Sequence, residues 1–207
     1  MCYNWQSSIV SFFVGTTCSL YLLQQKDKYV KHAGFFFVAV CLMQLIEFFM
    51  WMDQDCGWLN DLSSKFLVVV LILQVYALYF GGFIFDTIQI HNFYHPVIMV
   101  LVLLWGLYYI FQSLFLQQDY LCSKKGTKLG LEWDWGVVDK DSFKRIYYYF
   151  FIFIPLLLML RSHIWLFITI LGHLFYFYTE KDPSYWCFYS AGIPLILSIF
   201  LLLKRKM

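Results

Sequence analysis

Seven long apolar runs dominate this sequence and limit what it can fold into. They extend over residues 8–23, 34–52, 66–85, 96–115, 146–160, 164–178 and 186–203. Each run approaches the roughly 20 residues that an α-helix needs to cross a bilayer. The runs are continuous, whereas strands of a membrane barrel alternate apolar and polar residues. We therefore predict an all-α polytopic membrane bundle of about seven transmembrane helices, forming a single domain over residues 1–207.

The composition agrees with an integral membrane protein. Of the 207 residues, 61% are hydrophobic and only 14% are charged, compared with about 25% charged residues in a typical soluble domain. The net charge of +2 is too small to indicate a nucleic-acid partner, so membrane lipids are the expected partners. We expect no cleavable signal peptide, because residues 1–6 lack a basic residue and the first run is long enough to be a span.

Basic residues in the short loops predict the orientation. Lys26, Lys28 and Lys31 follow the first run, and residues 204–206 (KRK) close the last one. Short basic segments stay on the cytoplasmic side, so we predict an outside or luminal N-terminus and a cytoplasmic C-terminus. The long polar loop 116–145 then lies outside although it also contains lysines, which conflicts with the rule.

The long loop carries a pattern of its own. The segment KLGLEWDWGVV, residues 128–138, alternates apolar and polar residues between glycines. This pattern predicts a short hairpin or strand pair at the membrane interface, where Trp133 and Trp135 would suit the headgroup region. An irregular loop with interfacial tryptophans is the alternative.

Two of the six cysteines fall in loops rather than in apolar runs. Cys56 follows the second run and Cys122 follows the fourth, so with seven spans they lie on the same side of the membrane. If that side is extracytoplasmic or luminal, a disulfide between them is expected. The alternative is two free thiols.

Polar residues within the runs are the candidates for a binding site. Gln44, Glu47 and Trp51 share one face of the second predicted helix because they are three and four residues apart. Gln74 lies in the third run and His173 in the sixth. Ionisable residues inside a span usually face the bundle interior or a wet cavity. These side chains are candidates for a ligand, ion or proton site, or else form a hydrogen-bonded network that fixes helix packing.

A weaker candidate set lies in the loops. Asp53 and Asp55 follow the second run and suggest either an acidic, metal-binding column or simply solvated acids. His91 and His95 have the four-residue spacing of zinc ligands on a helix, but Pro96 disfavours helical geometry at His95. In a seven-span topology these acids and histidines lie on opposite sides of the membrane. We expect neither a resident metal nor another cofactor.

Two segments resemble an uncharacterised family of small seven-helix membrane proteins, which is bacterial with versions like those of large DNA viruses and protists. The family's Gln-x-x-Glu-x-x-x-Trp pattern maps to Gln44, Glu47 and Trp51. Its Ser-x-Trp-Cys-Phe segment matches residues 184–188 at the start of the last helix. The resemblance covers about a quarter of the chain and implies seven helices, but no activity.

Three functional hypotheses follow from the sequence. The first is a membrane protein with an intramembrane polar site around Glu47, serving as an ion, proton or small-molecule pathway or as a receptor. The second is a structural or assembly protein of a viral or organelle membrane. Besides lipids, the candidate partners under any of these hypotheses are an ion or small ligand and a second copy of the chain. The third is a lipid-modifying membrane enzyme using Asp53, Asp55, His91 and His95. The sequence leaves enzymatic activity open and favours it least.

Overall fold

Helices make up most of the computed structural model, which describes residues 4–87, 94–116, 119–126, 130–134, 137, 143 and 183–204. The helices are α1 (Trp5–Leu23), α2 (Lys28–Met52), α3 (Trp58–Ile84), α4 (Tyr94–Phe111) and α8 (Pro183–Lys204). A π-helical turn, η1 (Gln112–Leu116), extends α4. Two short strands, β1 (Lys124–Lys125) and β2 (Leu131–Glu132), follow it.

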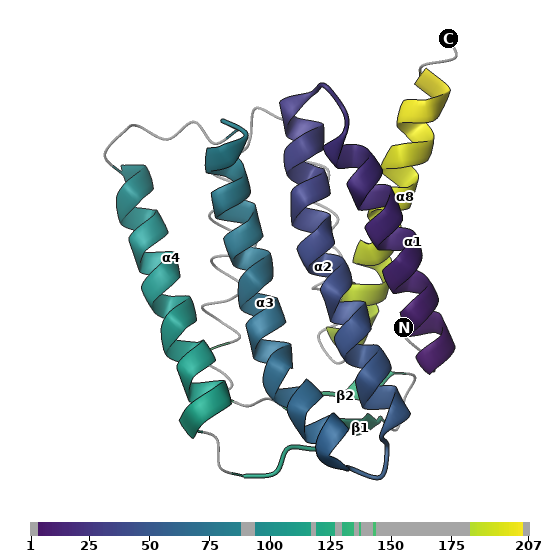
Figure 1. Ribbon diagram of the computed structural model, residues 1–207, viewed down its shortest axis with the longest axis vertical. Helices are drawn as coiled ribbons and strands as arrows, with labels where there is room; N and C mark the ends of the chain where they lie inside the picture. The colour runs from purple at the N-terminus through teal and green to yellow at the C-terminus, as the bar shows by residue number, and fades with distance from the viewer. Residues whose placement is uncertain are drawn as a thin grey trace.

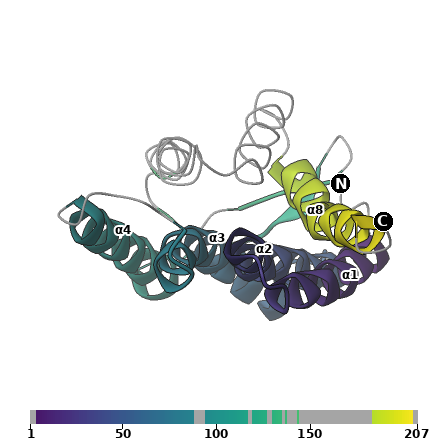
Figure 2. The same cartoon turned by 90° about the horizontal axis from the view of Figure 1, so that it is seen from above.

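The first four helices form one curved layer. They lie side by side in the order α4, α3, α2, α1, and each runs antiparallel to the next (Figure 1). Helix α8 packs behind α1 and α2, on the same side of the layer as the two strands (Figure 2). The beginning of α1 therefore shares one end of the bundle with the last turns of α2 and α4, and the last turn of α8 lies at the other end (Figure 1).

The structure supports the predicted membrane class and four of its spans. The helices Trp5–Leu23, Lys28–Met52, Trp58–Ile84 and Pro96–Leu116 are long and apolar enough to cross a bilayer. The seventh predicted run lies in α8, whose described apolar part, Gly192–Lys204, is shorter than a span. The fifth and sixth predicted runs, 146–160 and 164–178, lie outside the described residues. The chain thus has the helices expected of an integral membrane protein.

Helices α1 and α2 begin before their apolar runs because the side chains of their N-cap residues cap them. The Asn4 side chain accepts a hydrogen bond from the Ser7 backbone N–H, and Ser7 reciprocates in a capping box. The Asp27 carboxylate accepts from the N–H groups of Tyr29 and Val30 at the start of α2. These caps satisfy backbone donors that the first helical turn leaves without partners.

Helices α1 and α2 approach closely because small residues line their contact. Gly15 and Ser19 are buried on α1, and Ser19 lies against Gly34 of α2. A Cβ placed on Gly34 would lie 2.8 Å from the carbonyl oxygen of Ser19 and 2.8 Å from the backbone nitrogen of Leu23. Small residues at such positions let membrane helices pack backbone to backbone.

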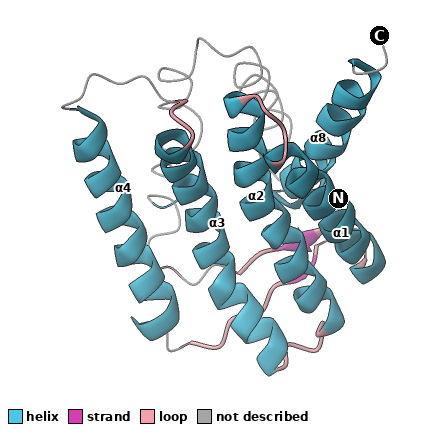
Figure 3. Ribbon diagram, turned by 45° about the horizontal axis from the view of Figure 1, so that its top comes forward, coloured by secondary structure: helices cyan, strands magenta, loops and turns pink. Residues whose placement is uncertain are grey.

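The long loop contains a hairpin, but not where the sequence pattern predicts it. Strand β1 pairs with β2 antiparallel, with Lys124 opposite Glu132 and Lys125 opposite Leu131 (Figure 3). Only β2 belongs to the predicted segment 128–138, because the loop turns earlier, at Gly130 with φ of 123°. Trp133 is half-buried and packs against the hydrophobic core, and Trp135 lies outside the described residues.

Candidate functional site

Glu47 is completely buried in the second span. Its side chain has 0% relative exposure, and so has that of Gln44 one turn earlier. Trp51, one turn later on the same face, is half-buried. The buried indole Nε1 of Trp51 has no hydrogen-bond partner among the described residues. The structure therefore places a carboxylic acid, an amide and an indole donor together on an inward face of α2.

Gln74 is also buried, at 1% exposure, but it lies further along the bundle. The antiparallel pairing of α2 with α3 is fixed by contacts of His32 with Leu78 and of Asn60 with Met50. This pairing places Gln74 about 12 Å along the axis from Gln44, given a rise of about 1.5 Å per helical residue. Gln74 is therefore buried about two helical turns from Gln44, and His173, the remaining candidate, lies outside the described residues.

The face of α2 that carries Glu47 contributes to a hydrophobic cluster shared with α3, α4 and the long loop. Met43 and Met50 lie four residues before and three residues after Glu47, and both have 0% exposure. They belong to one hydrophobic cluster with Leu131 and Phe143, against which Trp133 packs. Because residues three and four apart share a helix face, Glu47 lies on the face of α2 that contributes Met43 and Met50 to this cluster.

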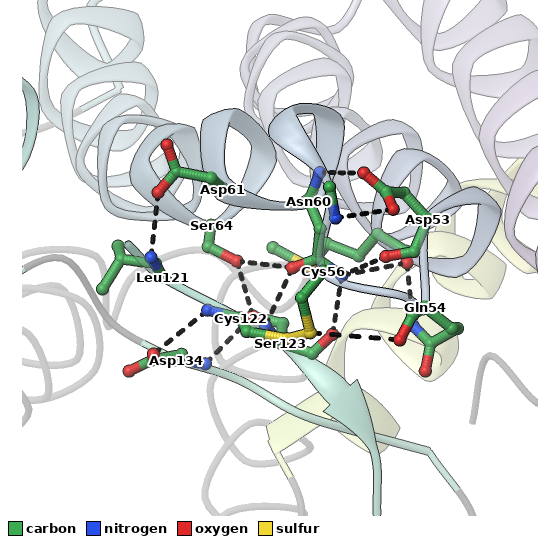
Figure 4. Close-up of a disulfide and its surroundings, with 12 residues drawn as sticks. Asp53, Gln54, Cys56, Asn60, Asp61, Ser64, Leu121, Cys122, Ser123 and Asp134 are labelled. Atoms are coloured by element: carbon green, nitrogen blue, oxygen red, sulfur yellow. Dashed lines mark hydrogen bonds between the residues drawn. A yellow bond between two sulfur atoms is a disulfide. The ribbon is translucent and has the colours of Figure 1, made fainter. Parts of the chain in front are cut away.

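A polar cap closes this end of the bundle. We use "the cap" for residues 119–126 and 130–134. A disulfide joins Cys122 of the cap to Cys56 in the α2–α3 connection, with the two Cα atoms 5.3 Å apart (Figure 4). This is the cysteine pair that the sequence analysis singled out, so the long loop is tied covalently to the corner where α2 ends and α3 begins.

Asn60, in the first turn of α3, is the hub of the hydrogen bonds beside the disulfide. Its Nδ2 donates to the carbonyl oxygens of Asp53 at 2.7 Å and of Ser123 at 2.9 Å, and more weakly to that of Met50 at 3.3 Å. Its Oδ1 accepts from the Ser123 backbone N–H at 2.9 Å. The hydroxyl groups of Ser64 and Ser123 are also hydrogen-bonded, at 2.8 Å. One buried amide side chain therefore connects α2, α3 and the cap (Figure 4).

Acidic side chains at this end serve as caps and anchors. Both carboxylate oxygens of Asp53 accept backbone N–H groups of α3, from Gly57 at 2.8 Å and Asn60 at 3.0 Å. Asp61 accepts the Leu121 N–H at 2.9 Å and pairs with Lys65 at 2.8 Å. Asp53 is thus a structural group at the start of α3, rather than a solvated acid or a metal ligand.

The structure does not bring together the loop acids and histidines that the sequence analysis considered as metal ligands or catalytic residues. Asp53 and Asp55 lie at the capped end, whereas His95 belongs to the first turn of α4 at the opposite end (Figure 1). His91 and the His95 side chain are outside the described part of the structure. Within that part, no group of three His, Cys, Asp or Glu side chains has the arrangement of a metal site.

His32 is a buried polar residue that the sequence analysis missed. It has 0% exposure near the start of α2, at the end of the bundle opposite the cap. Its Nε2 lies 2.8 Å from the Leu78 carbonyl oxygen, to which it can only donate, so Nδ1 accepts from the Thr87 hydroxyl at 2.6 Å. The ring also stacks on Phe85. Because His32 directly follows the lysines of the first loop, its local sequence does not predict a place in the core.

These features define a multi-pass α-helical membrane protein with a buried carboxylic acid beneath a disulfide-linked cap. Comparisons with protein-family models, with curated proteins and with solved structures found no match to this chain. The resemblance to the small seven-helix family therefore stays a prediction.

Proposed function

We propose that this protein is a seven-helix membrane protein that binds and conducts a cation or a proton at Glu47. The complete burial of Glu47 within a span-length helix carries the proposal. A carboxylic acid is costly in a membrane, and such residues mark ion and proton pathways. The Trp51 indole Nε1 on the same face, which is buried without a hydrogen-bond partner, supports the proposal. Buried donors in native proteins are nearly always hydrogen-bonded, so an exception indicates a functional role such as binding a ligand or water.

The orientation proposed from the sequence has further support. The capped end holds the Cys56–Cys122 disulfide, and disulfides persist on the extracytoplasmic or luminal side. The opposite end holds Lys28, Lys31 and Lys204 (Figure 1), as the positive-inside rule expects of a cytoplasmic side. An epitope tag at the C-terminus should therefore be detected only after cells are permeabilised, and detection on intact cells would reverse the orientation.

Flux through liposomes tests the function. Glu47→Gln preserves the size of the side chain but removes its charge and its exchangeable proton. We expect this variant to lose the proton, Na⁺ or K⁺ flux that the wild-type protein shows above empty liposomes. Asp55→Asn is the matched control, because Asp55 is exposed in the α2–α3 connection and its change should leave flux unaltered. Equal flux of all three cations in wild type and Glu47→Gln would instead favour a structural role for the protein.

A further inference from the structure

Lysine side chains gather at the end of the bundle opposite the disulfide. Lys26 lies in the α1–α2 connection, Lys31 lies in the first turn of α2, and Lys204 is the last residue of α8. In the sequence an arginine and another lysine follow Lys204. The helix ends that carry these residues lie at one end of the molecule (Figure 1). We call Lys26, Lys31 and Lys204 the lysine patch.

The packing of α8 against α1 brings the ends of these two helices to the same level. The Ser198 hydroxyl donates a hydrogen bond to the Cys18 carbonyl oxygen at 3.4 Å. Cys18 lies five residues before the end of α1, and Ser198 lies six residues before the end of α8. At about 1.5 Å per residue, both helices continue for about 8–9 Å past this contact, in the same direction (Figure 1). Since α8 also contacts α2, the three lysines lie on helices that pack against one another.

The positive charges of the lysine patch have no counter-ion in the described part of the structure. None of its side chains takes part in an ion pair or a hydrogen bond there, and all three are at least partly exposed. The two described acids at this end have other partners. Asp86 pairs with Lys28 at 3.1 Å, and the Asp27 carboxylate accepts two backbone N–H groups at the start of α2. An external anion is therefore needed to neutralise the patch.

Exposed apolar side chains border the lysine patch toward the middle of the bundle. Ile196, Phe200 and Leu203 are exposed and share one face of α8, because they are four and three residues apart. Leu20 is likewise exposed on α1. In a membrane protein such surfaces face lipid tails, and a lysine near the end of an inserted helix extends its ammonium group to the headgroup region. The patch thus lies at the depth of lipid phosphates, which favours a lipid over a soluble anion.

We propose that the lysine patch binds anionic phospholipids, whose headgroup phosphates form ion pairs with its ammonium groups. Basic clusters next to membrane helices attract lipids of net negative charge, and lysine binds phosphate as a point charge without a fixed geometry. Phosphatidylglycerol represents the class. Phosphatidylcholine carries the same phosphate, but its choline group cancels the charge, so it is the reference lipid. The binding does not depend on ion conduction at Glu47.

Electron paramagnetic resonance of spin-labelled lipids measures this preference. The purified protein is reconstituted in phosphatidylcholine vesicles, and the immobilised fraction of labelled phosphatidylglycerol is compared with that of labelled phosphatidylcholine. At low ionic strength we expect a preference for phosphatidylglycerol of at least about fivefold, the effect of one lysine near an anionic surface. Salt at about 1 M should reduce the preference toward one. A wild-type preference near one at low salt overturns the proposal.

A second comparison separates lipid phosphate from soluble phosphate. Inorganic phosphate should reduce the preference no more than chloride at equal ionic strength, because screening then acts alone. Stronger competition by phosphate would show that the patch takes a soluble anion, which contradicts a lipid site.

Charge-neutralised variants locate the binding. The triple variant Lys26→Gln, Lys31→Gln, Lys204→Gln should lower the preference at least about threefold. The matched control is Lys124→Gln with Lys125→Gln, which removes two exposed lysines of β1 at the capped end and should keep the wild-type preference. Lys204→Gln alone, at an exposed helix end, keeps the test open if the triple variant does not fold, and should lower the preference about twofold. Equal losses in the patch variants and the control would mean that only the total charge matters, and would refute the site.

Discussion

Replacement of Asn60 tests whether the polar cap is as strongly coupled to the helices as its hydrogen bonds indicate. Asn60→Ala removes three good hydrogen bonds of 2.7–2.9 Å, to Asp53 and to the N–H and carbonyl groups of Ser123. At about 1 kcal/mol each, these bonds contribute about 3 kcal/mol. Leaving the buried Ser123 N–H without a partner adds about 1–3 kcal/mol unless water replaces the amide. We therefore expect a loss of about 3–6 kcal/mol in the free energy of unfolding.

Asn60→Asp separates hydrogen bonding from packing, because the two side chains have almost the same shape. The introduced carboxylate still accepts from Ser123 but faces carbonyl oxygens to which Asn60 donates. This surrounding should raise the pKa of the new group above its value in the unfolded chain. The variant should therefore be most stable at acidic pH, below the unfolded pKa of about 4, and should lose stability as the pH rises through the folded pKa.

Equilibrium unfolding in mixed micelles, followed by tryptophan fluorescence, measures both variants. Gln54→Ala is the control, because it removes two side-chain hydrogen bonds, with the Lys125 N–H and the Met50 carbonyl oxygen, from a half-buried position and should cost about 2 kcal/mol or less. The reasoning about the hub is wrong if Asn60→Ala unfolds within about 0.5 kcal/mol of the wild type, or if Asn60→Asp is equally stable at acidic and alkaline pH.

Three further substitutions test other contacts. Gly34→Val should destabilise by about 1–3 kcal/mol, since its Cβ would press on the Ser19 carbonyl, a backbone atom that cannot rotate away; unaltered thermal unfolding in detergent would contradict this close packing. His32→Leu should cost about 1–3 kcal/mol, because it removes the buried hydrogen bonds that include the Thr87 hydroxyl; unfolding followed by circular dichroism measures the loss, and a stability equal to the wild type would refute it. Cys122→Ser removes a disulfide that joins residues 66 positions apart. The loss in the free energy of unfolding should stay below about 4 kcal/mol, the value for closing a loop of that length in a free chain, because the inserted helices already restrain the unfolded chain. A larger measured loss would show that the disulfide stabilises the fold by more than loop closure.

The sequence predicts much of the helical architecture because the bilayer sets one strong requirement. A chain that crosses the hydrocarbon core must hydrogen-bond its own backbone polar groups, which helices of about 20 residues do. The four apolar runs between residues 8 and 115 are long enough to satisfy this requirement. The helix starts are less predictable, since Asn4 and Asp27 extend α1 and α2 into polar sequence. The inward face with Gln44 and Glu47 follows from helical spacing alone.

The sequence by itself thus determined the membrane class, the helix faces and a cysteine pair that shares one side of the membrane. Only the tertiary structure decided that Met43 and Met50, which flank Glu47 on α2, share one cluster with Leu131 and Trp133, more than 80 residues away in the chain. Local patterns do not encode such contacts. The burial of Asn60 and His32 could not be predicted from the sequence for the same reason. A polar residue near a helix end is either solvated or buried, depending on which distant segment packs against it.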